Sequence, residues 1–177
     1  MEISKYHSII EVMSISKQIK RNQLPTGYWR NPIHFIACGF GTGASPYAPG
    51  TVGTLAGVLL YLPLSQLSLI PYLIVVVVGF GIGVWLCEVT SRDFGEQDHS
   101  GIVWDEVVGY WITMTAVPFD WGWVLMGFLL FRLFDVLKPW PIRRLDQSIK
   151  GGFGVMIDDV LAGIYAWLVL MFLVKFW

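Results

Sequence analysis

The sequence predicts an all-α integral membrane protein: a bundle of about five apolar helices, several of them short, with charged motifs at one face. Three observations favour this class. Hydrophobic residues make up 55% of the 177 residues and charged residues only 14%, with a mean hydropathy of +0.60, well outside the usual balance of a soluble domain. No Asp, Glu, Lys or Arg occurs between Arg30 and Glu88. Beyond Glu88, charged motifs alternate with apolar stretches.

The chain divides into a polar N-terminal arm, residues 1–30, and a helical membrane domain, residues 31–177. The arm has few apolar positions and contains Lys5, Lys17, Lys20, Arg21 and Arg30, so we expect it to lie at the membrane surface. It lacks an apolar core followed by a small-residue cleavage site, which argues against a cleaved signal peptide. The chain is therefore expected to insert through its internal apolar segments.

Five apolar segments in the membrane domain have the length of helices. A short helix near Pro32 comes first, and the glycines and prolines of residues 39–53 then interrupt the chain. The segment 69–87 is long enough to span hydrocarbon. Polar segments, 88–101 and 135–157, connect the later helices. The full set of expected apolar helices is 51–62, 69–87, 102–117, 123–134 and 160–176.

The basic residues predict the topology. If the arm lies in the cytoplasm, two crossings return residues 88–101 to that side and two more return residues 135–157. The positive-inside rule requires this arrangement, because this region carries Arg132, Lys138, Arg143, Arg144 and Lys150. Every charged motif is therefore expected at one cytoplasmic face.

The glycine-rich segment GFGTGASPYAPGTVGT, residues 39–54, is the first candidate functional segment. Its glycines permit positive φ and close backbone approach, and a loop that ends at a helix N-terminus near Thr51 can direct N–H groups at an anion. Thr51 is therefore a candidate phosphate-binding residue. Close packing of small residues between membrane helices explains the composition equally well. A dinucleotide loop is disfavoured, because no strand precedes it and Glu88 is too distant for a ribose contact.

The segment SRDFGEQDHSGIVWDEVVG, residues 91–109, carries the first acidic cluster. Asp98, Asp105 and Glu106 supply the hard oxygen ligands that Mg²⁺ prefers, with water and phosphate completing its coordination. Helix capping, at ~0.3–1 kcal/mol for each acid, accounts for one of them but hardly for a consecutive pair. His99 is either a general acid or base or an ordinary loop residue.

Residues 131–163 combine basic and acidic side chains. Four basic residues surround a turn at Pro139 and Pro141, and these prolines restrict the backbone. Asp135 lies between the first two basic residues. The positive charges of these residues suit the binding of a phosphate. The same charges also set the membrane topology and attract anionic lipid head groups. Asp158 and Asp159 come just before a long apolar run, so we expect this pair at a helix entrance. The candidate phosphate-binding residues here are Arg132, Lys138, Arg143 and Arg144.

Several chemistries lack their required residues. No C-x5-R motif follows Cys38 or Cys87, the D-x-D-x-[TV] signature is absent, and three histidines form no paired lipid phosphatase motif. Metal-assisted hydrolysis through carboxylate-held Mg²⁺ remains. The two cysteines are expected to be buried thiols. A net charge of −1 gives no basic field for a nucleic-acid partner.

Four motifs together resemble the phosphatidylglycerophosphatase A family over about residues 30–165: GFGTGxSPxAPGTVGT, DxxxxDHSGIVWDEVVG, FRLFDVLKPWPIRxxD and GGxGxMxDDxxAG. The resemblance implies a helical fold and Mg²⁺-dependent hydrolysis of phosphatidylglycerophosphate to phosphatidylglycerol and phosphate at the bacterial cytoplasmic (inner) membrane. We expect Asp105, Glu106, Asp158 and Asp159 to be the catalytic carboxylates, as Mg²⁺ ligands or general base; a covalent aspartyl-phosphate is the less favoured alternative. The implied metal site is Asp105, Glu106, Asp135, Asp158 and Asp159, with Asp98 and His99 nearby.

Two other functions remain open from sequence. A cation or proton transporter also uses intramembrane acids, but it needs them along the bilayer depth, whereas the predicted topology puts them at one end. A CDP-alcohol phosphotransferase is also a Mg²⁺ membrane enzyme, but its D-G-x2-A-R-x8-G-x3-D-x3-D pattern is absent. The expected partners are thus a phospholipid substrate and the membrane. The sequence carries no signal for the oligomeric state.

Overall fold

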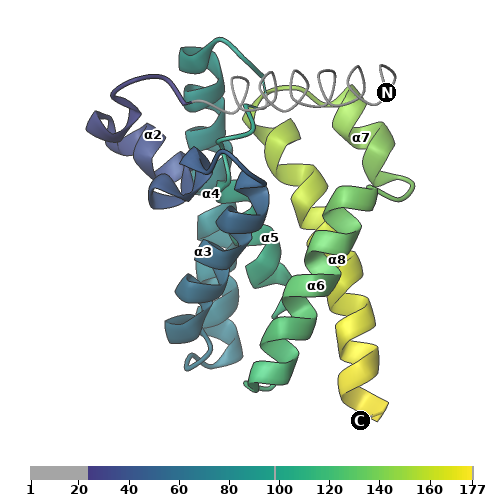
Figure 1. The fold of residues 1–177 in the computed structure, drawn as a ribbon. Helices are drawn as coiled ribbons and strands as arrows, with labels where there is room; N and C mark the ends of the chain where they lie inside the picture. The colour runs from purple at the N-terminus through teal and green to yellow at the C-terminus, as the bar shows by residue number, and fades with distance from the viewer. Residues whose placement is uncertain (1–23, 98, 177) are drawn as a thin grey trace, which may run out of the picture.

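The computed structural model describes residues 24–97 and 99–176, and every regular element in these ranges is helical. Most of the arm predicted over residues 1–30 lies outside them. In chain order the elements are η1 (Tyr28–Arg30), α2 (Pro32–Ala37), η2 (Gly39–Ala44), α3 (Pro49–Leu64), α4 (Leu69–Phe94), α5 (Trp104–Thr113), α6 (Trp121–Leu137), α7 (Ile142–Ser148) and α8 (Gly151–Phe176). Figure 1 shows α3, α4, α6 and α8 running roughly side by side, with α5 enclosed among them.

Two of the described helices, α4 and α8, are long and apolar enough to cross a membrane. Both exceed the predicted lengths. α4 continues through polar residues to Phe94 and ends where Gly95 takes a left-handed conformation, φ 72°. α8 begins at Gly151 instead of residue 160. The prediction placed the helix ends where the apolar composition ends. Polar residues can continue a helix when their side chains are solvated or hydrogen-bonded to one another.

The shorter helices follow the prediction approximately. α3 and α6 extend the expected segments by a few residues, while α5 is shorter than the expected 102–117. Local caps explain two starts: Pro49 occupies the first turn of α3, and the Asp120 carboxylate accepts from the Gly122 N–H before α6. α7 was not expected. It lies within the polar segment 135–157, where no apolar periodicity signalled a helix.

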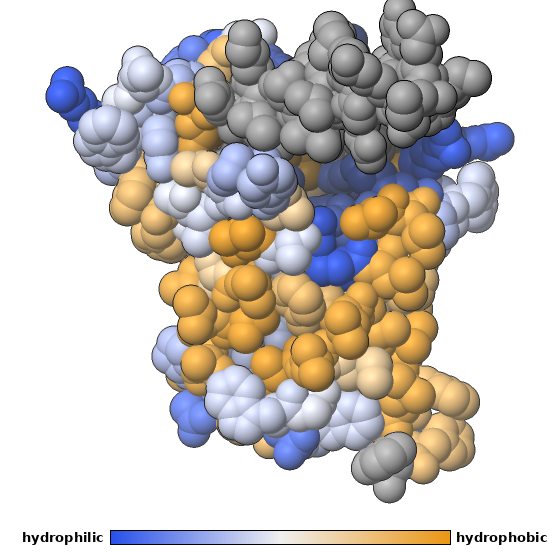
Figure 2. Space-filling model, viewed as in Figure 1, coloured by the Kyte–Doolittle hydropathy of each residue, from blue (hydrophilic) through white to orange (hydrophobic). Residues whose placement is uncertain are grey.

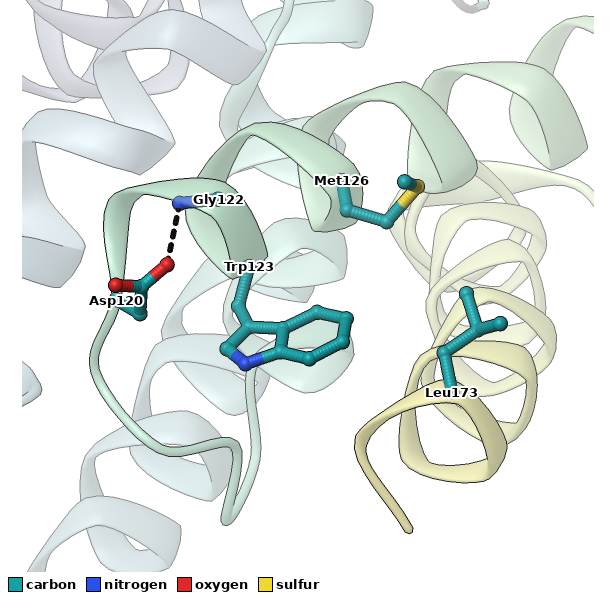
Figure 3. A pocket seen from close by; sticks show the side chains of 5 residues that line it. All are labelled: Asp120, Gly122, Trp123, Met126 and Leu173. Carbon is teal, nitrogen blue, oxygen red and sulfur yellow. Dashed lines mark hydrogen bonds between the residues drawn. The ribbon is translucent and has the colours of Figure 1, made fainter. Parts of the chain in front are cut away.

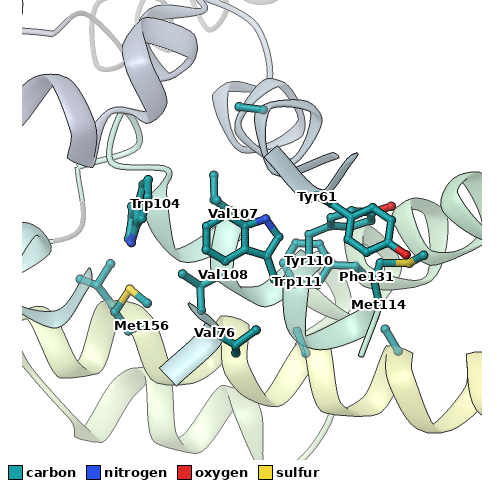
Figure 4. Packing of buried hydrophobic residues seen from close by; sticks show 14 of the residues in the cluster. Tyr61, Val76, Trp104, Val107, Val108, Tyr110, Trp111, Met114, Phe131 and Met156 are labelled. Carbon is teal, nitrogen blue, oxygen red and sulfur yellow. The ribbon is translucent and has the colours of Figure 1, made fainter. Parts of the chain in front are cut away.

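The core is built around α5 (Figure 4). Most of its residues are buried, including Val107, Val108 and Tyr110. The polar atoms of its aromatic residues reach backbone carbonyls of neighbouring helices: Trp111 Nε1 donates to Gly57 at 3.2 Å, and Tyr110 Oη donates to Val124 at 3.1 Å. In a membrane bundle such bonds matter, because no water is present to satisfy these groups.

Glycines let α5 approach its neighbours closely. A Cβ on Gly163 of α8 would lie 2.5 Å from the Gly109 carbonyl oxygen, and one on Gly57 of α3 would lie 3.1 Å from Val107 Cα. These contacts match the small-residue packing of membrane helices. The two cysteines are buried thiols, as predicted.

The surface has an apolar band below a broad polar end, and smaller hydrophilic patches lie at the opposite end (Figure 2). The exposed side chains of α4, α6 and α8 are largely apolar. The N-termini of α3, α5 and α8 and the C-termini of α4 and α6 lie toward the polar end (Figure 1). A hydrophilic recess opens just below it, between α3 and α6 (Figure 2).

Candidate active site

A pocket of about 320 Å³ lies at the polar end of the bundle. It is formed by the start of α3, the start of α5, the end of α6 and the first turns of α8, so it joins segments more than one hundred residues apart. Its lining residues are Ala48, Pro49, Gly50, Ser100, Ile102, Asp105, Glu106, Arg132, Asp135, Lys138, Asp158 and Asp159. The pocket therefore contains all five carboxylates predicted from the described acidic motifs.

Three of these carboxylates form a compact group. Asp105 and Glu106 come from the first turn of α5 and Asp159 comes from α8, and one oxygen from each lies within 4.8 Å of the others. Asp105 and Asp159 are only 7% and 3% exposed. Buried carboxylates this close repel one another unless a cation or protons offset their charge. The expected position of Asp158 and Asp159 at a helix entrance was wrong: both lie about two turns inside α8.

Ion pairs surround the three carboxylates. On α6, Arg132 Nη1 donates to Asp135 Oδ2 one turn away and lies 3.9 Å from Glu106 Oε1. Lys138, just after α6, pairs with Asp158. Each of these pairs links neighbouring helices or turns at the pocket wall, so basic and acidic groups face one another across a small space.

The electrostatics of the pocket fit a cation beside an anion. Burial raises the pKa of Glu106, and the negative charges of Asp159 and Asp135 act in the same direction. Glu106 Oε2 and Arg132 Nε are both buried without a hydrogen-bond partner among the described residues. One is an acceptor and the other a donor, so a hard cation and a phosphate oxygen would satisfy both.

The start of α3 forms the opposite wall. α3 begins at Pro49, two residues before the predicted N-terminus, and Ala48 precedes it with φ 44°. A Cβ on Gly50 would lie 2.3 Å from Glu106 Oε1 and 3.1 Å from Arg132 Nη1, so a larger residue there would force these side chains to shift. The first N–H groups of a helix have no intrahelical partner. Thr51 follows directly, partly buried and outside the pocket lining.

Other predicted site residues lie elsewhere. His99 is buried, its Nδ1 accepts from the Gly101 N–H at 3.0 Å, and its ring packs against Phe94 at 5.4 Å; it does not line the pocket. Arg143 and Arg144 are exposed on α7, also outside the lining. Asp98 lies outside the described residues.

The sequence prediction overlooked two contributors. Gly50 lines the pocket and admits the Glu106 side chain, although it stood within a motif already singled out. Glu88 accepts a hydrogen bond from the Gly152 N–H and so ties the end of α4 to the start of α8. The sequence did single out Glu88, because it is the first acidic residue after the long charge-free stretch.

A second, larger pocket of about 590 Å³ lies at the other end of α6 and α8 (Figure 3). It is lined by Asp120, Gly122, Trp123, Met126 and Leu173. Its one carboxylate is engaged in capping, since Asp120 Oδ1 accepts from the Gly122 N–H at 2.7 Å. No basic side chain is among these lining residues, so none of them can pair with a phosphate as Arg132 or Lys138 could in the polar pocket.

Comparison with known proteins agrees with the motifs in the polar pocket. The sequence profile of the family described as phosphatidylglycerophosphatase A matches residues 35–174, a range that includes every residue of the pocket. The chain belongs to this family.

The match between this chain and its curated relatives covers most of the length of each relative. A phosphatidylglycerophosphatase A of Escherichia coli K12 is 47% identical over 83% of this chain and 86% of its own, and one of Haemophilus influenzae is 49% identical over 83% and 91%. A Bacteroides thetaiotaomicron protein, provisionally named a phosphatidylinositol-3-phosphatase, is 42% identical over 76% and 89%. No solved structure matches the chain.

Proposed function

We propose that this chain hydrolyses phosphatidylglycerophosphate to phosphatidylglycerol and inorganic phosphate, using Mg²⁺, at the bacterial inner membrane with its pocket toward the cytoplasm. The observation that carries the proposal is the polar pocket. Three close carboxylates, Asp105, Glu106 and Asp159, face the basic residues Arg132 and Lys138. Membership of the family and the names of two relatives supply the substrate.

Two roles of the pocket side chains concern the metal and the phosphate. Asp105, Glu106 and Asp159 would hold Mg²⁺, which when bound would neutralise phosphate charge and make a water molecule more acidic. Arg132 and Lys138 lie within reach of phosphate oxygens and stabilise the charge that builds on them in the transition state.

The remaining roles concern the attacking water and the leaving group. Asp158, beside Asp159 on α8, accepts a proton from the water that attacks phosphorus. The phosphorus–oxygen bond to the glycerol group breaks, and that oxygen takes up a proton to give the alcohol of phosphatidylglycerol. Backbone N–H groups at the start of α3 orient the phosphate from the opposite wall.

The apolar surface keeps the lipid tails in the bilayer while the head group enters the pocket. α4 and α8 can cross the membrane, and the pocket lies at one end of the bundle. The five carboxylates line this one pocket and are not distributed along the helices. A transporter that relays ions through the bilayer depth is therefore not favoured.

Phosphate release from phosphatidylglycerophosphate by the purified full chain, with and without Mg²⁺, tests the proposal. Asp105→Asn and Asp158→Asn should each lower kcat by roughly 10³-fold or more, as expected when a residue of a metal or general-base site is removed. Asp120→Asn in the far pocket is the matched control and should stay within about twofold, because that carboxylate only caps a helix.

Two results would contradict the proposal. Unchanged activity in folded Asp105→Asn and Asp158→Asn variants would show that the polar pocket is not the active site. Full activity after chelation of divalent cations would exclude Mg²⁺ as the cofactor, but it would not contradict the proposed substrate.

A further inference from the structure

The basic residues of the segment 131–150 fall into two groups with different surroundings. Arg132 and Lys138 line the polar pocket and pair with carboxylates. Arg143, Arg144 and Lys150 are exposed, and none of them lines that pocket. The basic residues of this one segment therefore form two structural groups, one inside the polar pocket and one on the surface.

An exposed aromatic residue accompanies the outer group. Trp140 is 72% exposed, immediately beyond the pocket residue Lys138. We call Trp140, Arg143, Arg144 and Lys150 the α7 platform. Tryptophan at a bilayer interface and basic residues just outside it are the usual pattern of membrane-surface contact.

The α7 platform is held firmly by its neighbours. Ile142, fully buried, anchors the start of α7 in the core. Tyr165 Oη of α8 donates to the Trp140 carbonyl at 3.3 Å. Within the turn, the Ile142 N–H donates to Pro139 at 2.8 Å and the Arg144 N–H to Pro141 at 2.9 Å. The position of the backbone that carries the basic side chains is thus set by the fold.

Apolar exposure changes to basic exposure over a few residues at this point. Val136 and Leu137, in the last turn of α6, are 70% and 64% exposed, whereas the exposed basic residues Arg143, Arg144 and Lys150 follow in and just after α7. A bilayer presents the same order, with hydrocarbon first and head groups next. The α7 platform therefore fits the boundary between them.

We propose that the α7 platform binds the head groups of anionic phospholipids beside the catalytic pocket. The charge of the platform is complementary to such lipids and not to zwitterionic ones. Each arginine near an anionic surface should contribute roughly fivefold to the preference. Because the substrate of the proposed function is itself an anionic lipid, the platform would concentrate it next to the pocket entrance.

Lipid binding can be measured without catalysis. The full chain, reconstituted in phosphatidylcholine vesicles, is probed with spin-labelled phosphatidylglycerol and spin-labelled phosphatidylcholine, and the motionally restricted fraction of each label is compared. The wild type should prefer the anionic label. Arg143→Gln with Arg144→Gln should lower that preference roughly tenfold or more, and the paired Lys substitutions should retain it. Arg92→Gln is the matched control, since that exposed arginine is offset by neighbouring Asp93.

Kinetics separate the platform from the pocket. In the double Gln variant, hydrolysis of bilayer phosphatidylglycerophosphate should fall more than hydrolysis of a short-chain, water-soluble analogue. An unchanged lipid preference in that variant would overturn the proposal, as would an equal loss on both substrates, which would place the arginines on the scissile phosphate. A wild type that hydrolyses neither substrate would instead contradict the proposed function, while the spin-label result would still decide the platform.

Discussion

The two pockets at opposite ends of α6 and α8 differ in both size and chemistry. The far pocket, at about 590 Å³, is nearly twice the volume of the polar one, yet it is lined mainly by Trp123, Met126 and Leu173. The polar pocket, at about 320 Å³, contains five carboxylates and two basic residues. Volume alone would select the far pocket, whereas the density of opposed charges selects the polar one.

The difference has a physical cause. Burying several carboxylates together is unfavourable, because desolvation and mutual repulsion both oppose ionisation. Such a cluster is retained where a cation or basic side chains compensate its negative charge, and that makes it informative about function. An apolar hollow on a membrane protein, in contrast, costs little, since lipid tails can fill it.

Apart from the carboxylate variants, the largest expected effect that would test this contrast is at Arg132. Arg132→Gln removes the charge that lies 3.9 Å from Glu106 and pairs with Asp135. We expect kcat/KM for phosphatidylglycerophosphate to fall about 10²–10³-fold, the usual cost of losing one transition-state donor. Arg132→Lys should recover part of this loss, because it keeps the charge without the forked geometry. A loss below about tenfold in Arg132→Gln would show that the polar pocket is not where phosphate binds.

An intermediate effect is expected from the shape of the pocket. Gly50→Ala places a methyl group against Glu106 Oε1 and Arg132 Nη1, so both side chains must shift. Phosphate release should fall at least about tenfold, although alanine favours the helix by up to ~1 kcal/mol. Gly81→Ala on α4, where nothing lies within 4 Å of the added Cβ, is the matched control and should retain activity. Equal activity in the two variants would argue against close packing at the pocket wall.

The smallest effect on catalysis is expected in the far pocket. Trp123→Ala removes a partly buried ring and should lower the free energy of unfolding by about 1–2 kcal/mol through lost packing. Its kcat, measured well below the Tm, should stay within about twofold of wild type. Circular dichroism on heating in detergent gives the stability. A large loss of kcat with unchanged Tm would mean that the far pocket takes part in the reaction.

Much of the fold followed from composition. The charge-free stretch between Arg30 and Glu88 predicted membrane helices, and α4 and α8 confirm that two helices can cross. That about five helices are apolar spans, and that the charged end faces the cytoplasm, stay predictions. Boundaries were less accurate: α7 and the first two turns of α8 lie in a segment expected to be irregular. Composition shows where the chain is apolar, whereas a helix continues until a cap or a glycine ends it.

The sequence by itself determined the helical class with its apolar segments, the family motifs and the acidic residues that line the polar pocket. Only the tertiary structure decided that Asp105, Glu106 and Asp159 lie within 4.8 Å of one another, that Arg132 and Lys138 face them, and that Arg143 and Arg144 do not. The reason is that apolar burial and charge are properties of local segments. Which charges meet depends on how α3, α5, α6 and α8 pack, and that packing is set by contacts between residues far apart in the chain.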